Sequence, residues 1–245
     1  MASSVVTPER FAKGRTFEDY VRYVGTPENL QREAWGGYFP DSGSKPTVRK
    51  DNSAVFRERY ERARLSEPQV AAIKWLAAQP GGPAKILVIS EDWSSDCLRD
   101  LPWLARLAEA GGLELRIFDR DGQKILGVRR PDPAAYPDGN HDLMLEFLNA
   151  KNGGEWASLP VVAIYTKDMK ELCRYIEYPA IYHKDRVRGH QLSVDFERAK
   201  RPRAFEAPKT FNVARKAGPC AKAVLARDRR LRICEPKTCC PHLGL

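Results

Sequence analysis

Long apolar runs are missing from this sequence. Its apolar stretches are strand-sized, such as the one in 85–90, whereas a membrane-spanning helix needs about 20 consecutive apolar residues. The first residues, MASSVVTPERFAKGRTFEDY, also lack the apolar core of a secretory signal. We therefore expect a cytoplasmic protein that has no membrane partner. With 42% apolar and 30% charged residues, the 245-residue chain is typical of a soluble globular protein with one sizeable core.

A Cys-x-x-Cys motif is also missing, although the stretch EDWSSDCLRDLP at 91–102 would contain one if Ser94 were a cysteine. Thiols stay reduced in the cytoplasm, so cysteines there are seldom structural disulfides. We expect catalytic, redox-sensing, metal-binding or inert roles for the six cysteines, which stand at positions 97, 173, 220, 234, 239 and 240.

Most of the chain has no excess charge, because the excess lies at its end. From Arg198 onward, 13 of the 41 Lys and Arg residues face 3 of the 32 Asp and Glu residues. Such a basic tail can contact nucleic acid, an anionic surface, or an acidic patch on its own body or on a second copy. A solvated tail with no partner fits equally well. The aromatic residues of this tail that could stack on bases are Phe205 and Phe211 alone, so we do not expect it to bind nucleic acid.

Helical patterns fill the first part of the chain. Two short helices are predicted within 16–34, and a charged helix within 52–65 follows a loop at 36–49. We expect these helices to form an N-terminal extension, residues 1–65, that packs on the rest. A separate small domain is the alternative.

Helices and strands alternate in the next part of the chain. A helix from Ser66 ends at the turn 79–83, and a buried strand at 85–90 precedes a helix that ends at Gly111-Gly112. With a strand at 113–119, this order implies a parallel crossover unit. The remaining predictions are an irregular insertion at 120–140, a helix at 142–148, a strand pair at 160–166 and 171–179, and a closing helix at 182–200.

Cys97 is predicted in the first turn of the helix that follows the strand 85–90. Unpaired amide donors and the helix dipole favour a thiolate there, which predicts a lowered thiol pKa. The alternative is a buried cysteine that behaves as a small apolar side chain. The acids Glu91, Asp92 and Asp96 are expected to be solvated loop charges, with proton relay as the alternative.

The ordered set KILVISEDWSSDC, the leucine-bearing helix after it, LELRIFD and SLPVVAIY resembles the thioredoxin superfamily. Within that superfamily it is similar to bacterial proteins with an N-terminal helical extension and an EDWC-x-x-C-x-x-x-LP type motif. The resemblance implies an α/β thioredoxin-like fold, with a central mixed sheet flanked by helices, over 66–200. A basic tail with cysteines, 201–245, then completes the chain.

The resemblance also assigns roles to individual residues. Trp93 would precede the active-site pair, Cys97 would be its second cysteine, and Pro160 would be the cis-proline facing it. A cis bond occurs at only about 5–6% of X-Pro positions, so this is a sharp prediction. Leu159 would present its backbone to an extended substrate. The alternative for Pro160 is a trans proline at the first position of a strand.

Ser94 departs from this pattern, because it occupies the place of the nucleophilic cysteine. Disulfide exchange needs an attacking thiolate and a resolving thiol, and serine cannot attack. An introduced Cys→Ser change is the origin we favour. The alternatives are a natural variant that uses Cys97 alone, and a retained fold without redox activity. The natural single-cysteine variant would resemble peroxiredoxins, with Ser94 hydrogen-bonding the Cys97 thiolate, but Ser90 stands where their motif has proline.

The tail cysteines support two hypotheses. As zinc ligands, Cys220, Cys234, Cys239 and Cys240, with His242, would supply enough donors but lack the usual Cys-x2-4-Cys spacing at each end. As redox groups, Cys239 and Cys240 could relay electrons to a thiol site. Cys173 is expected to pack in the sheet, and His183 and His190 to be ordinary surface or core histidines.

The sequence thus predicts a thiol–disulfide oxidoreductase of thioredoxin type with catalytic positions Ser94 and Cys97. Its substrates would be protein or small-molecule thiols and disulfides, it would need no cofactor, and its tail is a candidate for homo-oligomer formation. The alternatives are a thioredoxin-fold adaptor that binds metal or a partner through its tail, and a single-cysteine peroxidase.

Overall fold

The computed structural model describes residues 4–35, 45–126, 130–151 and 153–179. Residues 1–184 form one compact unit, which includes both the N-terminal helices and the body that follows them. The predicted closing helix at 182–200 and the tail lie outside the described residues.

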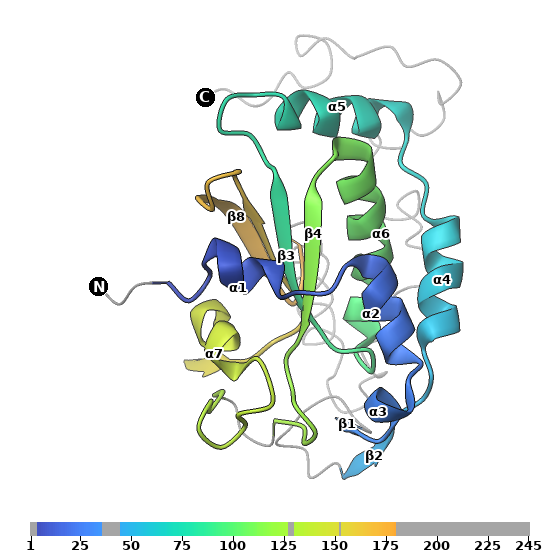
Figure 1. The fold of residues 1–245 in the computed structure, drawn as a ribbon, viewed down its shortest axis with the longest axis vertical. Coiled ribbons are helices and arrows are strands. Elements are labelled where there is room, and N and C mark those ends of the chain that lie inside the picture. The colour runs from blue at the N-terminus through green and yellow to red at the C-terminus, as the bar shows by residue number, and fades with distance from the viewer. Residues whose placement is uncertain (1–3, 36–44, 127–129, 152, 180–245) are drawn as a thin grey trace, which may run out of the picture. The chain divides into compact units, whose positions relative to one another are not determined.

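A four-stranded mixed sheet forms the centre of this unit (Figure 1). Strands β3 (Lys85–Ser90) and β4 (Glu114–Asp119) are parallel, as the crossover unit required. Strand β7 (Val161–Tyr165) pairs antiparallel with β3, and β8 (Glu171–Ile176) pairs antiparallel with β7. The order β4-β3-β7-β8 places β3 inside the sheet, and all five residues from Ile86 to Ser90 are buried. Burial on both faces explains why this strand is continuously apolar.

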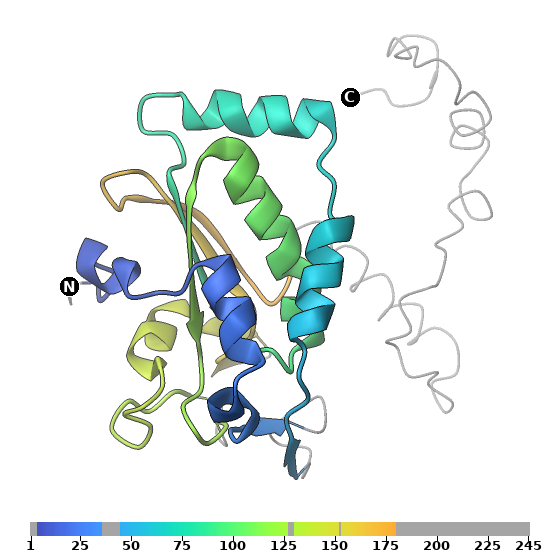
Figure 2. The same cartoon turned by 45° about the vertical axis from the view of Figure 1, so that its right-hand side comes forward.

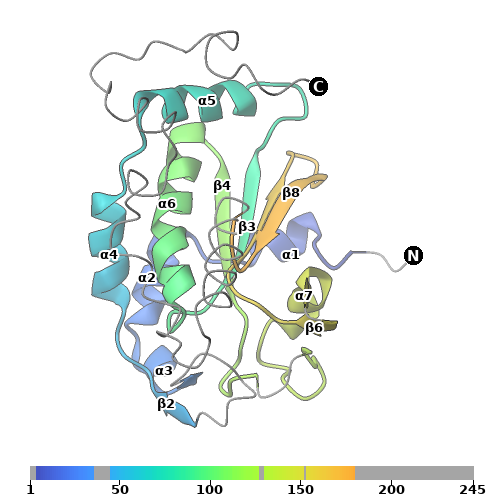
Figure 3. The same cartoon turned by 180° about the vertical axis from the view of Figure 1, so that it is seen from behind.

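Helices cover both faces of the sheet (Figures 1 and 2). Helices α2 (Phe17–Val24), α4 (Ser53–Arg62) and α6 (Ser95–Gly111) lie side by side on one face. Helices α1 (Pro8–Ala12) and α7 (His141–Met144) lie on the other. The same two layers are visible from behind in Figure 3. This is the predicted fold class, a mixed sheet flanked by helices.

The N-terminal helices share the apolar core of the body. Tyr20 of α2 and Phe56 of α4 meet edge to face, with ring centroids 5.6 Å apart. Both belong to the same buried cluster as Ile86 and Val88 of β3. Because these side chains bury one another, the extension is part of the core that supports β3. Helix α5 (Glu67–Ala77) crosses one end of the unit and contacts α6 (Figure 1).

Short elements escaped the sequence analysis. Three-residue strands pair antiparallel in two places, within the N-terminal part and before β7, and short helical turns join longer elements. Segments of three to five residues contain too little periodicity to be recognised. These are β1 (Glu33–Trp35), β2 (Pro46–Val48), β5 (Asn149–Lys151), β6 (Gly154–Trp156) and α1. In contrast, α3 (Pro27–Leu30) is the second of the two short helices predicted within 16–34, and the 3₁₀ turn η2 (Leu145–Phe147) lies within the predicted helix 142–148.

Cys173 was predicted to pack in the sheet, and this is wrong. It lies in β8 opposite Ile164, but its side chain is exposed. β8 is the last strand of the sheet, and Leu172, Cys173 and Arg174 are all exposed.

Among the described residues, no helix combines the length and the hydrophobicity needed to cross a membrane.

Candidate thiol site

Helix α6 begins at the predicted site, and Ser94 is its N-cap. The Ser94 backbone is extended, and its hydroxyl oxygen accepts a hydrogen bond from the Cys97 amide at 3.4 Å. The Ser94 carbonyl accepts the first helical bond from the Leu98 amide at 2.9 Å. Serine is a favoured N-cap residue, so Ser94 has a structural role in starting the helix. Cys97 lies in the first turn, where it was predicted.

The Cys97 thiol is completely buried. Burial raises its pKa to about 11, although hydrogen bonds from the Ser94 and Ser90 hydroxyls act in the opposite direction. The predicted lowering of the thiol pKa is therefore wrong. The helix N-terminus does favour an anion, but removal of the thiolate from water outweighs that effect here.

The Leu159–Pro160 peptide bond is cis, as predicted. It immediately precedes β7, in which Val161 pairs with Ile89 of β3. Since β3 leads directly into the loop before α6, the cis bond lies at the same end of the sheet as Ser94 and Cys97. Leu159 and Cys97 belong to one buried cluster, so the structure brings together residues that are 62 positions apart.

Trp93 packs, partly buried, against that same cluster. The Arg120 guanidinium lies 5.5 Å from the centre of its ring. Within the described part of the chain, the indole nitrogen of Trp93 is buried and has no hydrogen-bond partner. Trp93, Ser94, Cys97 and the Leu159–Pro160 bond thus surround the start of α6, and their roles in binding and catalysis remain predictions.

A tyrosine from the N-terminal extension also reaches the site. The Tyr20 hydroxyl donates a hydrogen bond to the Ser90 hydroxyl oxygen at 3.1 Å. Burial, helped by the negative charge of Asp119, raises the pKa of Tyr20 well above its usual value, so Tyr20 stays protonated. Because the Ser90 hydroxyl acts to lower the pKa of the Cys97 thiol, Tyr20 orients a group that favours the thiolate.

The loop before Trp93 is held by buried ion pairs that the sequence analysis missed. Glu91 and Asp92 were expected to be solvated, and this is wrong, because they are only 0% and 2% exposed. The Arg32 guanidinium lies 2.9 Å from one Glu91 oxygen, and Arg49 lies 2.9 Å from the other. Arg49 also pairs with Asp92. Asp96, the third acid, is half-buried and pairs with Arg99 at 2.8 Å.

These pairs connect the N-terminal extension to the site. Arg32 and Arg49 are 3% and 5% exposed, and both come from the first 65 residues. The Glu91 carboxylate also accepts a hydrogen bond from the Asp121 amide at 2.8 Å, and the Asn29 amide donates to Asp92 at 3.3 Å. Buried charges persist only when they are paired and hydrogen-bonded, so the position of this loop depends on the extension.

A second set of buried charges lies at the end of β4. Burial and the nearby negative charge of Glu91 raise the pKa of Asp119 to about 6, while Arg32 and Arg15 act in the opposite direction. Asp121 is fully buried as well, yet Arg120, at 2.8 Å, and His141 hold its pKa well below its usual value. The two buried carboxyl groups differ in pKa because the charge of Glu91 raises that of Asp119, whereas Arg120 and the hydrogen bond from His141 lower that of Asp121.

No group of three or more His, Cys, Asp or Glu side chains in the described ranges could hold a metal ion. The proposed zinc ligands Cys220, Cys234, Cys239 and Cys240 lie outside the described residues, as do His183 and His190. The zinc and redox-relay hypotheses for the tail therefore remain predictions.

Comparisons with known proteins bear on the family. Residues 44–129 match a family described as Thioredoxin, a range that contains β3, the loop after it and α6 with Ser94 and Cys97. No curated protein matches the chain. A crystal structure of a protein of unknown function from Pseudomonas aeruginosa is similar, with 18% sequence identity and a TM-score of 0.43. That likeness covers 78% of this chain and 87% of that one. The family match supports a thioredoxin-superfamily assignment for residues 44–129, in agreement with the mixed sheet.

Proposed function

We propose that this chain carries a thioredoxin-type thiol–disulfide exchange site that lacks its attacking sulfur. With Ser94 in place, the chain binds extended polypeptides that carry thiols or disulfides but does not turn them over. One observation carries this proposal. Among the residues that the structure describes, the one thiol at the site is that of Cys97, which is completely buried at the start of α6, the helix that Ser94 caps.

Exchange with two thiols shows what is missing. A thiolate at position 94 would attack one sulfur of a substrate disulfide, forming a mixed disulfide and releasing the other substrate sulfur as a thiolate. The Cys97 thiolate would then attack the sulfur at position 94, release the second substrate thiolate and leave a 94–97 disulfide. The serine hydroxyl cannot make the first attack. Cys97 is a poor substitute, because it has no exposed surface and its pKa is raised to about 11.

The same burial argues against a single-cysteine peroxidase. A peroxide-reducing cysteine must be a thiolate near neutral pH and must be reachable by the oxidant. Cys97 meets neither requirement.

Backbone groups beside the cis bond support polypeptide binding. Within the described residues, the Leu159 N–H and C=O form no hydrogen bond, and Pro160 has no N–H to donate. The Pro160 carbonyl is already used, because it accepts a hydrogen bond from the Glu177 amide at 2.8 Å. An extended segment can therefore pair with Leu159, as a strand pairs with a sheet edge, and Trp93 offers it an apolar contact.

A working oxidoreductase is the second candidate, favoured by the intact surroundings of position 94. The strand, the loop, the helix start, a buried thiol at position 97 and a cis-proline are all present, as two-thiol exchange would require. The two candidates differ only in whether the chain acts with serine or requires cysteine at that position.

A disulfide-reduction assay tests the proposal. We expect the chain to reduce a disulfide-bonded protein, with dithiothreitol as electron donor, no faster than dithiothreitol alone. Ser94→Cys should be at least about tenfold faster, because the attacking thiol is restored. The double variant Ser94→Cys, Cys97→Ser is the matched control, which should form mixed disulfides and turn over more slowly than Ser94→Cys, because only dithiothreitol can resolve them. Turnover by the unchanged chain would favour the second candidate, and an inactive but folded Ser94→Cys would contradict both.

Binding is tested separately, by NMR of the unchanged chain. A reduced cysteine-containing peptide should shift the indole N–H resonance of Trp93 and the Leu159 amide resonance. A peptide in which proline removes the pairing amides is the control, and equal shifts with both peptides would contradict backbone pairing at Leu159.

A further inference from the structure

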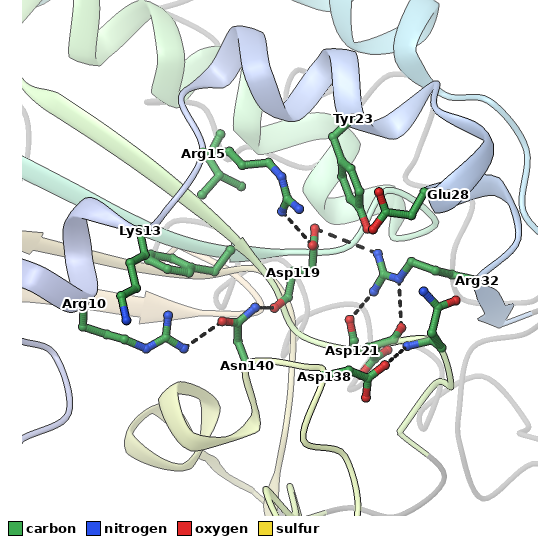
Figure 4. Close-up of a pocket in the computed structure, with 14 residues that line it drawn as sticks. Arg10, Lys13, Arg15, Tyr23, Glu28, Arg32, Asp119, Asp121, Asp138 and Asn140 are labelled. Atoms are coloured by element: carbon green, nitrogen blue, oxygen red, sulfur yellow. Dashed lines mark hydrogen bonds and ion pairs between the residues drawn. The ribbon is translucent and has the colours of Figure 1, made fainter.

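A polar cavity of about 420 Å³ opens beside the carboxyl end of β4 (Figure 4). The segment between α1 and α2 forms one wall, α2 and α3 contribute another, and the loops after Asp119 and before Asn140 complete it. Cys97, Pro160 and Trp93 are absent from its lining, so the cavity is separate from the thiol site.

The floor of this cavity consists of charges that neutralise one another. Arg32, Asp119 and Asp121 are 3%, 8% and 2% exposed. Arg15 pairs with Asp119 at 2.7 Å, and Arg32 donates to the Gly122 carbonyl at 2.8 Å. Since these groups already have partners, the floor is a fixed polar surface rather than a source of free charge.

The rim carries two charges without such partners. Lys13 and Glu28 line the cavity, and the side chain of neither forms a hydrogen bond or ion pair with any described residue. Figure 4 shows Lys13 on one side of the cavity and Glu28 on the opposite side. Arg10 lies next to Lys13, but it is engaged by Asn140 at 2.7 Å and by Asp142 at 3.0 Å. The uncommitted charge is therefore positive on one side and negative on the other.

The positive side is held rigidly by the backbone. The Arg15 amide donates to the Ile117 carbonyl and the Ile117 amide donates to the Arg15 carbonyl, both at 2.8 Å. A Cβ on Gly14 would lie 2.7 Å from the Arg116 Cβ, so only glycine allows the segment to approach β4 this closely. On the negative side, Tyr23 stacks under the Arg15 guanidinium at 3.7 Å. Burial and Asp119 raise the Tyr23 pKa, so its hydroxyl remains a hydrogen-bond donor.

We propose that this cavity binds a small zwitterion, an organic molecule with one anionic and one cationic end. Its anionic group pairs with Lys13, and its cationic group pairs with Glu28. The volume of the cavity lies within the range of small-molecule sites, about 300–1,000 Å³. A simple anion would leave Glu28 without a partner and a simple cation would leave Lys13 without one, whereas a zwitterion satisfies both.

A ladder of amino acids of increasing length tests this site. The full chain is titrated with glycine, 4-aminobutyrate and 6-aminohexanoate, while NMR follows the amide resonances of Gly122 and Asn140. Butyrate and butylamine, each with one charge, are the ligand controls. At least one zwitterion should bind, and both controls should bind at least about fivefold more weakly, since an exposed ion pair contributes about that factor.

Charge-neutral variants locate the two ends of the ligand. Lys13→Gln and Glu28→Gln should each weaken binding of the best zwitterion by about fivefold. Lys74→Gln and Glu67→Gln, on α5 and outside the cavity, should leave it unchanged. The proposal is overturned if no zwitterion shifts the two resonances, if butyrate or butylamine binds as well as the zwitterions, or if the rim variants bind as well as the unchanged chain.

Discussion

Two cysteines in the described residues stand at opposite extremes of exposure. Cys97 is buried and Cys173 is exposed on β8. With iodoacetamide at pH 8, Cys173 should be alkylated rapidly, whereas Cys97 should react at least about a hundredfold more slowly, because few molecules hold a thiolate and none exposes it. Peptide mapping by mass spectrometry measures the two rates separately.

The pH dependence sharpens this expectation. The Cys97 rate should rise about tenfold per pH unit until the pH approaches its pKa of about 11. In denaturant, both cysteines should react rapidly. Equal rates in the folded protein would show that the thiol site opens readily.

Asp119 should make stability depend on pH. Burial raises its pKa to about 6 from an ordinary value of 3.8, so the folded protein holds this proton more tightly than the unfolded chain does. Its contribution to stability is therefore complete below about pH 4 and is lost as the pH rises through about 6. The stability difference between the unchanged chain and Asp119→Asn should fall by about 2–3 kcal/mol over this window.

Urea denaturation at several pH values measures this difference. Asp119→Asn also lacks the ion pair with Arg15, which changes its free energy of unfolding at every pH above the titration of Asp119. The informative quantity is therefore the slope, between pH 4 and 6, of the stability difference between the two proteins. A difference that does not change with pH would place the Asp119 pKa near its ordinary value.

At the scale of elements, the loop between β3 and α6 depends on arginines from the N-terminal extension. Arg49→Met should lower the free energy of unfolding by about 3–5 kcal/mol, because it leaves the buried carboxylates of Glu91 and Asp92 short of a partner. Arg62→Met is the matched control. Arg62 pairs with Glu58 on the surface of α4, with side chains 78% and 57% exposed, so its loss should change stability by less than about 1 kcal/mol.

Chemical denaturation followed by circular dichroism compares the two variants. A similar, small effect of both changes would show that water reaches the carboxylates of Glu91 and Asp92.

Long elements and the helix start were predictable because they leave local signals. The continuous apolar run of β3, the leucine spacing of α6 and the proline before β7 each appear within a few residues of sequence. The burial of Glu91 could not be predicted in this way. Its partners Arg32 and Arg49 lie 59 and 42 positions away, and only the folded chain brings them to it. Two acids directly after a fully buried strand were the available signal.

The prediction of a lowered pKa for the Cys97 thiol was wrong for a related reason. Helix position is a local property, and the sequence placed Cys97 correctly in the first turn. Burial is a property of the whole packing around Cys97, which includes residues as distant as Leu159. The larger of the two effects was therefore the one that local patterns do not reveal.

For the whole molecule, the N-terminal extension and the body should fold as one unit. Residues 1–184 form one compact unit, in which Tyr20 and Phe56 share a buried cluster with β3. A fragment of residues 1–184 should unfold in a single cooperative transition. A fragment of residues 66–184 should show none, because it would expose that cluster and leave Glu91 unpaired.

Differential scanning calorimetry of the two fragments checks this expectation. A cooperative transition in the shorter fragment would show that the body folds without the extension, and it would support the extension as a separate small domain.

Ser94 has a consequence for how this site can change over generations. Serine and cysteine codons can differ by a single base, so the chain with Ser94 and the cysteine form proposed to exchange disulfides are one base change apart. They are unequal neighbours, because Ser94 caps α6 and the loss of an N-cap costs about 1 kcal/mol. A cysteine at position 94 would therefore make α6 less stable, whereas the serine hydroxyl keeps the helix start capped.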